Sequence, residues 1–155
     1  MDSIFVSGIA CAAPIAALAA LLSAQPGRAE APPAASLEVT VTGIKNAKGV
    51  IQLAICPPGV GFPDCKDKAV RTGKLTIQNG VARGSFAGLP AGTYAVSVFH
   101  DANVNGKLDT FAGIPKEGYG FSRNPGFKPR APKFAEVQIE VTGQANTSIK
   151  LRYLF

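Results

Sequence analysis

The chain has 155 residues, of which 46% are hydrophobic and 17% are charged, and its formal net charge is +6. This length predicts one domain, and this composition excludes a disordered chain. Glycine (17 residues) and proline (12 residues) are plentiful, which indicates many turns and a β-rich fold. A positive net charge can draw a protein to anionic surfaces such as lipid headgroups or lipopolysaccharide, although it also occurs in secreted proteins without such a partner.

The first 29 residues have the pattern of a secretory signal peptide. Ile4–Ala24 form an uncharged run of small and apolar residues, and Gly27 and Ala29 suit a signal-peptidase cleavage site. The residues before this run include an aspartate and no Lys or Arg, which departs from the usual pattern. The run is close to the length of a bilayer span, so a retained membrane anchor is the alternative. We expect export to the periplasm or the extracellular space, with no transmembrane span in the mature chain.

The mature chain has two cysteines, Cys56 and Cys65. An exported protein can keep a disulfide, and the segment between them is short and rich in Gly and Pro, so we predict a disulfide that closes this loop. The spacing is not that of a C-x-x-C redox pair. A zinc site would need more ligands than His100, the one histidine in the chain, can add.

Period-two alternation of apolar and polar residues begins after a Pro/Ala linker at 30–35 and predicts about seven short strands in one domain at 36–155. The predicted strands are 36–43, 49–56 as its partner, both arms of a hairpin at 73–86, the strand that ends near 101, 133–143 and 146–155. Asn79-Gly80 is a strong signal for the hairpin turn. No helix is expected. The sequence therefore predicts an all-β fold, a two-sheet antiparallel β-sandwich of the immunoglobulin or transthyretin kind. Tyr94, just before a strand, is expected to bond back to the chain as in a tyrosine corner.

Two adjoining segments, LPAGTYAVSVFHDANVNGKLD and GIPKEGYGFSRNP, resemble an uncharacterised family of secreted bacterial proteins known as domain of unknown function 2141. The similarity covers about Leu37 to Tyr153 and is most specific between Phe99 and Phe121. The resemblance implies an exported single domain, similar in outline to small sandwich domains of bacterial surface proteins. It implies no established activity, so no catalytic residue is carried over, and the cysteine pair is not counted as a family trait.

The segment DANVNGKLD, residues 101–109, has the residue types of a calcium loop. Calcium prefers six to eight oxygen ligands, which flexible loops supply at alternate positions beside a glycine. The candidate ligands are Asp101, Asn103, Asn105, the backbone carbonyl of Lys107, and Asp109, with Glu117 as a more distant candidate. The twelfth position lacks the Glu of an EF-hand, so a bound ion would have a Kd of ~0.1–1 mM. The alternative is a polar turn without metal, because Asn and Asp side chains readily bond the local backbone.

The segment 111–133 carries aromatic and basic residues but no sustained periodicity. Aromatic faces can stack on sugars, and cations can hold phosphates or carboxylates. Tyr119, Phe121, Arg123 and Lys128 are therefore candidates for binding an envelope glycan or an anionic surface. Nucleic acid is an improbable partner for an exported protein. The alternative is that the aromatic residues fold down and cap one end of the sandwich.

A small hydrolase centred on His100 and Asp101 is a further alternative. Adjacent residues on a strand point to opposite faces, which disfavours a direct acid–base pair. No serine or cysteine occupies a nucleophile motif, so we do not expect an enzyme. The sequence favours an exported module with a structural or binding role in the cell envelope.

Overall fold

The computed structural model describes residues 34–155, which belong to one compact unit. The predicted signal peptide and most of the predicted linker lie outside the described residues. The first strand already begins at Ala34, two residues before the predicted start of the domain. Among the described residues, no helix has the length and apolar character needed to cross a bilayer.

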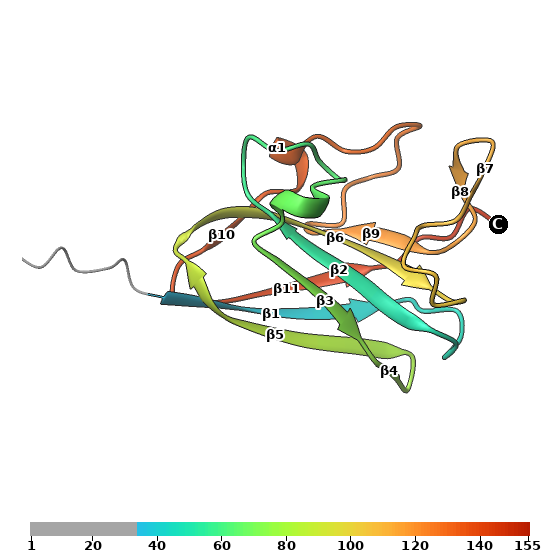
Figure 1. Cartoon of the computed structure of the whole chain (residues 1–155), viewed down its shortest axis with the longest axis horizontal. Coiled ribbons are helices and arrows are strands. Elements are labelled where there is room, and N and C mark those ends of the chain that lie inside the picture. Colours follow the sequence, from blue (N-terminus) through green and yellow to red (C-terminus); the bar gives the residue numbers. More distant parts are fainter. Residues whose placement is uncertain (1–33) are drawn as a thin grey trace, which may run out of the picture. The chain divides into compact units, whose positions relative to one another are not determined.

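The fold is all-β, with two larger sheets and one small hairpin (Figure 1). The first sheet has the order β11-β1-β5-β4, with strands β1 (Ala34–Thr42), β4 (Ile77–Gln78), β5 (Val81–Pro90) and β11 (Gln144–Lys150). The second contains β2 (Val50–Cys56), β3 (Arg71–Leu75), β6 (Gly92–Asp101), β9 (Tyr119–Phe121) and β10 (Ile139–Val141). Its order is β10-β6-β2-β3, and β9 pairs with the same β6 strand. The hairpin consists of β7 (Thr110–Phe111) and β8 (Ile114–Pro115).

The alternating apolar residues of both sheets form one hydrophobic core. Leu37, Val39 and Val41 of β1 are 0–1% exposed, and Ile51 and Ile55 of β2 are 0% exposed. These residues belong to one cluster together with apolar residues of β5, β6, β10 and β11. The burial along β1 and β2 therefore follows the period-two alternation of their sequences.

The predicted pairing of residues 36–43 with 49–56 is wrong. β1 pairs with β5 on one edge and with β11 on the other, whereas β2 pairs with β3 and β6. The connection between β1 and β2 therefore crosses from one sheet to the other. The β1–β11 pair is also parallel, so the first sheet is not wholly antiparallel.

Two local predictions are confirmed. Asn79 and Gly80 have φ values of 52° and 75° and form the turn between β4 and β5. The Tyr94 hydroxyl donates a hydrogen bond of 2.6 Å to the carbonyl oxygen of Pro90, four residues earlier. That bond fixes the start of β6, the strand that leads to the candidate site.

The predicted strand at 133–143 is wrong in its first half. Phe134–Val137 form the one-turn helix α1, and only Ile139–Val141 pair as strand β10. The carboxylate of Glu136 accepts a hydrogen bond of 2.7 Å from the Lys133 backbone N–H, which stabilises the first turn of a helix. A short 3-10 helix, η1 (Lys66–Lys68), follows the cysteine loop.

Cys56 and Cys65 form the predicted disulfide, with a Cα–Cα distance of 5.8 Å. Both residues are buried. The disulfide joins the end of β2 to the segment that precedes η1, so it lies at the end of β2 remote from Val50, which pairs with Asp101.

Candidate functional site

Residues 101–118 leave the second sheet at the end of β6 and return to it at β9, and we call this segment the 101–118 excursion. Both of its ends are fixed by the backbone, because the His100 N–H donates to the Gly118 carbonyl at 2.7 Å. A Cβ atom on Gly118 would lie 2.3 Å from the Tyr153 ring, so only glycine fits there without a shift. The β7–β8 hairpin forms the outer part of the excursion and stands apart from both sheets in Figure 1.

Asp101 is the buried anchor of the excursion, with a 0% exposed side chain. Its Oδ2 accepts hydrogen bonds from Gln52 Nε2 at 2.8 Å and from the Gly106 N–H at 2.8 Å, and its Oδ1 accepts one from the Asn105 N–H at 2.9 Å. Burial alone would raise the pKa of Asp101, but the hydrogen bonds donated to its carboxylate outweigh burial and lower that pKa. Asp101 is thus an ionised carboxylate that holds the first turn of the excursion.

The predicted calcium ligands are brought together around Asp109. Asn103 Nδ2 donates to Asp109 Oδ2 at 2.8 Å, and Asn105 Nδ2 donates to Asp109 Oδ1 at 2.9 Å. The amide oxygens of the two asparagines also accept backbone bonds, from the Asn105 N–H at 3.2 Å and from the Lys107 N–H at 2.8 Å. The oxygen atoms of this turn therefore accept internal hydrogen bonds, as a polar turn requires. The side chain of Lys107 is exposed.

Glu117 joins the two halves of the excursion. Its Oε1 accepts a hydrogen bond of 3.0 Å from the Ala102 N–H, and its Oε2 accepts one of 3.0 Å from the Asp109 N–H. Glu117 was predicted only as a more distant candidate ligand. Its separation in sequence from residues 101–109 does not indicate that its side chain contacts their backbone. The excursion therefore holds three carboxylates, those of Asp101, Asp109 and Glu117.

None of these three carboxylates forms an ion pair with a described residue. The two ion pairs recorded among the described residues both involve Glu136, which lies outside the excursion. Their negative charge is balanced by N–H donors rather than by cations. Within residues 34–155 no three or more His, Cys, Asp or Glu side chains lie close enough together to hold a metal ion by themselves. A cation in the excursion would therefore need asparagine or backbone oxygens as additional ligands.

His100 is a buried structural residue, with a 1% exposed side chain. Its Nε2 lies 2.7 Å from the Lys48 carbonyl oxygen and must donate, because a carbonyl only accepts. Its Nδ1 lies 2.8 Å from the Tyr153 hydroxyl, which donates to it when the ring is neutral. Burial also raises the pKa of Tyr153. Both nitrogens of the buried ring are thus engaged within the fold.

Tyr119 and Phe121 belong to a row of aromatic rings rather than to an open stacking platform. Their ring centroids are 5.8 Å apart, and the Phe121 ring lies 5.7 Å from that of Phe62 in the cysteine loop. The Phe62 ring in turn lies 6.3 Å from that of Phe134 in α1. Both Tyr119 and Phe121 are half-buried, so the contacts match the capping role considered for the aromatic residues.

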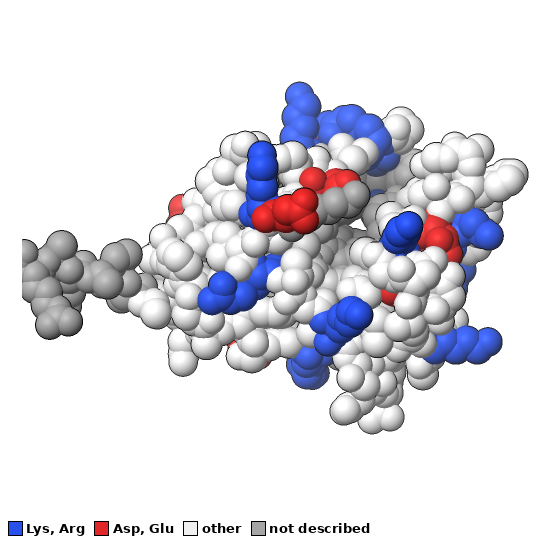
Figure 2. Space-filling model, viewed as in Figure 1, with Lys and Arg blue, Asp and Glu red and all other residues white. Residues whose placement is uncertain are grey.

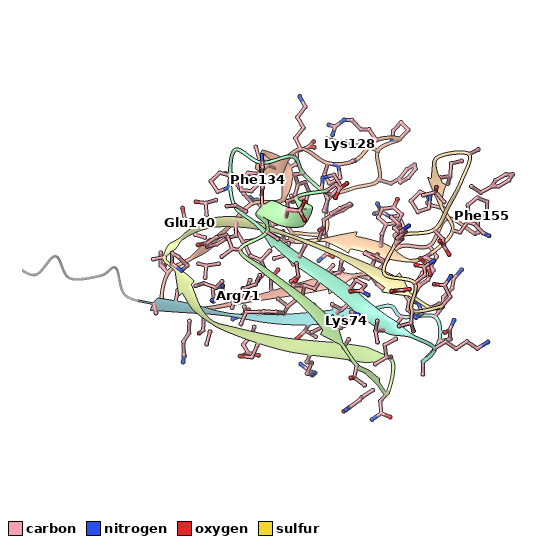
Figure 3. All side chains as sticks on the ribbon, in the orientation of Figure 1. Arg71, Lys74, Lys128, Phe134, Glu140 and Phe155 are labelled. Atoms are coloured by element: carbon pink, nitrogen blue, oxygen red, sulfur yellow. A yellow bond between two sulfur atoms is a disulfide. The ribbon has the colours of Figure 1, made fainter. Side chains whose placement is uncertain are left out.

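Tyr119, Phe121 and Lys128 line one shallow hollow of about 20 Å³. Its other lining residues are Pro125, Gly126, Arg130, Pro132, Glu136 and Arg152, so Arg123 is not among them. Lys128 and Arg130 both pair with Glu136, which lowers the pKa of that carboxyl, chiefly through its hydrogen bond from Arg130. Lys128 projects on the outer loop in Figure 3.

A larger hollow of about 570 Å³ lies at the β4–β5 hairpin. It is lined by Lys74, Leu75, Thr76, Gln78, Asn79, Val81 and Arg83. These residues include no carboxylate, histidine or cysteine. The hollow therefore lacks the side chains that most often act as general acids or bases at neutral pH. It contributes nothing to the candidate site.

Comparison with known proteins gives one family. No curated protein and no solved structure matches the chain. A family model described as an uncharacterized protein conserved in bacteria (DUF2141) matches residues 39–150, a range that includes the 101–118 excursion and most of both sheets. The chain belongs to this family, domain of unknown function 2141.

Proposed function

We propose that the chain is an exported β-sandwich of the immunoglobulin or transthyretin kind, with a structural or binding role in the bacterial cell envelope, and that its excursion binds Ca²⁺. The Cys56–Cys65 disulfide supports export, because disulfides persist in oxidising compartments. The signal-like pattern of the first 29 residues agrees with this. The shared core of the two larger sheets supports the sandwich.

The observation that carries the calcium proposal is the gathering of oxygen-bearing side chains without a cationic partner. Asp109 contacts Asn103 and Asn105 at 2.8 and 2.9 Å, and the carboxylates of Asp101 and Glu117 bond to the backbone of the same turn. A cation here would use Asp109 together with asparagine and backbone oxygens, because no three acidic side chains of the described residues lie close enough together to hold it alone. Hard oxygen ligands of this kind select Ca²⁺ over softer metals.

Calcium binding requires an exchange of contacts within the turn. Asn103 and Asn105 now direct their amide nitrogens toward Asp109, so their side chains would rotate to present oxygen. The backbone bonds that these oxygens accept from Asn105 and Lys107 would then be lost or rearranged. This cost, together with the two neutral asparagine ligands, predicts weak binding, with a Kd of ~0.1–1 mM.

The test is thermal unfolding of residues 30–155 in EDTA and then with calcium up to several millimolar, with magnesium as the ion control. A ligand of the folded state stabilises it by about 1.4 kcal/mol at ten times its Kd. We expect a calcium-specific rise in Tm that Asp109→Asn abolishes. Asp67→Asn, which removes an exposed carboxylate in η1, is the matched control and keeps the rise. If calcium leaves Tm unchanged across this range, the excursion is a polar turn and the calcium proposal fails.

The glycan alternative has weaker support. Lys128 and Arg130 line the hollow beside Tyr119, but their cations are already paired with Glu136. Phe127 is 59% exposed, but the Arg152 guanidinium lies 5.5 Å from its ring centroid. A sugar would have to displace these contacts before it could stack on the aromatic residues.

A further inference from the structure

Exposed apolar side chains are concentrated at one end of the domain. The described chain has six exposed large hydrophobic residues: Val104, Phe111, Ile114, Phe127, Leu154 and Phe155. Five of these six belong to the excursion or to the last two residues of the sequence, and only Phe127 does not. In the view of Figures 1 and 3, Phe155 lies on the same side of the domain as the β7–β8 hairpin. Scattered exposed apolar residues need no explanation, but a group at one end indicates an interaction surface.

The β7–β8 hairpin holds two of these side chains at its tip. Phe111 and Ile114 are paired across the hairpin, and they are 67% and 45% exposed. Ala112 and Gly113 between them have φ values of 50° and 79°, which is a two-residue turn with both residues left-handed. The alanine is held in a conformation that is uncommon for residues other than glycine. The sequence thus fixes a sharp tip that carries one large apolar side chain on each strand.

Polar bonds hold the base of the hairpin. The Lys116 N–H donates to the Asp109 carbonyl at 2.8 Å, and Glu117 fixes the Asp109 N–H at 3.0 Å. Phe111 and Ile114 are also absent from the hydrophobic core and from the partly buried residues packed against it. The hairpin therefore presents apolar surface on a fixed base.

Exposed lysines accompany the excursion. Lys48 belongs to the connection between β1 and β2, and the bond between His100 and the Lys48 carbonyl ties this connection to the base of the excursion. The side chains of Lys48, Lys107 and Lys116 are exposed. Lys45 of the same connection is already engaged, because its Nζ donates to the Phe155 carbonyl and lies 4.7 Å from the centroid of the Tyr153 ring. The acidic groups of the excursion lie deeper, because Asp101 is buried and both Asp109 and Glu117 are half-buried. Figure 2 shows both blue and red side chains next to the white projection at this end.

We propose that this end of the domain docks on an anionic lipid surface, with Phe111 and Ile114 entering the interface and Lys107 and Lys116 contacting the headgroups. An exposed hairpin tip with two apolar side chains and exposed lysines in the same segment matches a membrane interface, where apolar groups insert and cations meet phosphates. A glycan or a small molecule would instead require a concave site. The docking rests on the proposed envelope role but not on calcium.

The test is co-sedimentation of residues 30–155 with vesicles, in EDTA throughout so that the calcium site takes no part. These residues contain the compact unit that carries the core, and without 1–29 the apolar N-terminal run cannot insert by itself. Vesicles of phosphatidylglycerol and phosphatidylethanolamine are compared with vesicles of phosphatidylcholine at about 0.1 M salt. We expect binding to the anionic vesicles that is at least about tenfold stronger and falls steeply in high salt.

Paired variants test which residues dock. Phe111→Ser with Ile114→Ser should weaken binding about tenfold, whereas Phe127→Ser removes an equally exposed aromatic residue elsewhere and should change it less than about twofold. Lys107→Gln with Lys116→Gln should weaken binding and flatten its salt dependence.

Equal binding to both vesicle types, or binding that the hairpin variant leaves intact, would overturn the proposal. So would vesicle-free dimerisation through the same residues, seen by light scattering. A calcium-dependent rise in Tm that persists in the Phe111/Ile114 variant would leave the calcium proposal standing either way.

Discussion

The two larger sheets and the 101–118 excursion are stabilised by opposite means. In the sheets, apolar side chains such as Leu37 and Ile51 are 0% exposed and pack in one core. In the excursion, Phe111 and Ile114 face solvent, while the carboxylates of Asp101 and Glu117 accept hydrogen bonds from backbone N–H groups. The two larger sheets, which are stabilised by apolar burial, thus lie beside the excursion, which is stabilised by hydrogen bonds to carboxylates.

This difference separates the stabilising core from the region for which we propose binding. Apolar burial contributes about 25 cal/mol per Å² and depends little on pH or on ions, so the sheets supply a scaffold. Bonds to carboxylates respond to pH, to salt and to cations, and the side chains that they hold in place are free to meet a partner. The excursion is therefore the part of the chain to which we assign binding.

The largest expected effect comes from the point where the two regions touch. Gly49 has a φ of 69°, and a Cβ atom there would lie 1.9 Å from the backbone oxygen of Asp101. Gly49→Ala must therefore displace either the β1–β2 connection or the anchor of the excursion, and we expect it to cost about 3 kcal/mol or more in the free energy of unfolding. Urea unfolding followed by circular dichroism measures this cost.

Gly59→Ala is the matched control for that substitution. Gly59 has a φ of 77°, but a Cβ atom added there would meet no other atom within 4 Å, so the substitution introduces the backbone strain without the clash. Its cost should be only about 1–2 kcal/mol. Equal costs for the two variants would show that the close approach at Gly49 contributes nothing.

Removing the disulfide should affect the sheets and leave the excursion intact. Cys56 and Cys65 are 9 residues apart, and closing a loop of this size stabilises the folded chain by about 2–3 kcal/mol on the chain-entropy account. The Cys56→Ala/Cys65→Ala variant should lose this amount in urea unfolding. Its calcium-dependent rise in Tm should equal that of the parent chain, and loss of that rise would contradict the independence of the two regions.

Asp101→Asn should affect the excursion first. The variant keeps the size of the side chain but replaces one accepting oxygen with an N–H₂ group that faces donors, at a cost of about 1–3 kcal/mol. The hydrogen bonds that Asp101 accepts lower its folded pKa below the ordinary aspartate value of 3.8. The stabilisation by the ionised form is therefore complete well above pH 3.8 and is lost as the pH falls through the folded pKa.

The pH dependence gives the control for this substitution. The stability gap between the parent chain and Asp101→Asn, measured by urea unfolding, should be widest near pH 7 and narrow below the unfolded pKa of about 3.9. A gap that stays constant from about pH 7 to about pH 3 would show that the charge of Asp101 does not support the turn.

Features set by neighbouring residues could be predicted from the sequence, whereas long-range pairings could not. The Asn79-Gly80 turn, the Tyr94 bond to Pro90 and the Cys56–Cys65 disulfide all depend on short segments. Alternation shows which face of a strand is buried but not which strand lies beside it. The partners of β1 therefore could not be read from its own residues, and β1 was assigned to β2 by proximity in sequence.

The candidate site shows the same limit. Asp101, Asn103, Asn105 and Asp109 were found because they alternate within one short segment. Glu117 was placed only at a distance, because its contact with the Asp109 N–H depends on the β7–β8 hairpin turning the chain back. The segment 133–143 was predicted as a continuous strand because Val137, Ile139 and Val141 alternate, whereas the Glu136 bond to Lys133 begins a helical turn before them.

We propose that the excursion responds to calcium while the sheets do not, and residue-resolved NMR of residues 30–155 tests this difference most directly. The backbone N–H groups of Ala102, Asn105, Gly106 and Asp109 all donate to carboxylates of the excursion. We predict that their amide shifts move together as calcium rises through the ~0.1–1 mM range, while those of β1 and β2 stay fixed. Shifts that do not move at several millimolar calcium, or that move equally in both regions, would contradict the account.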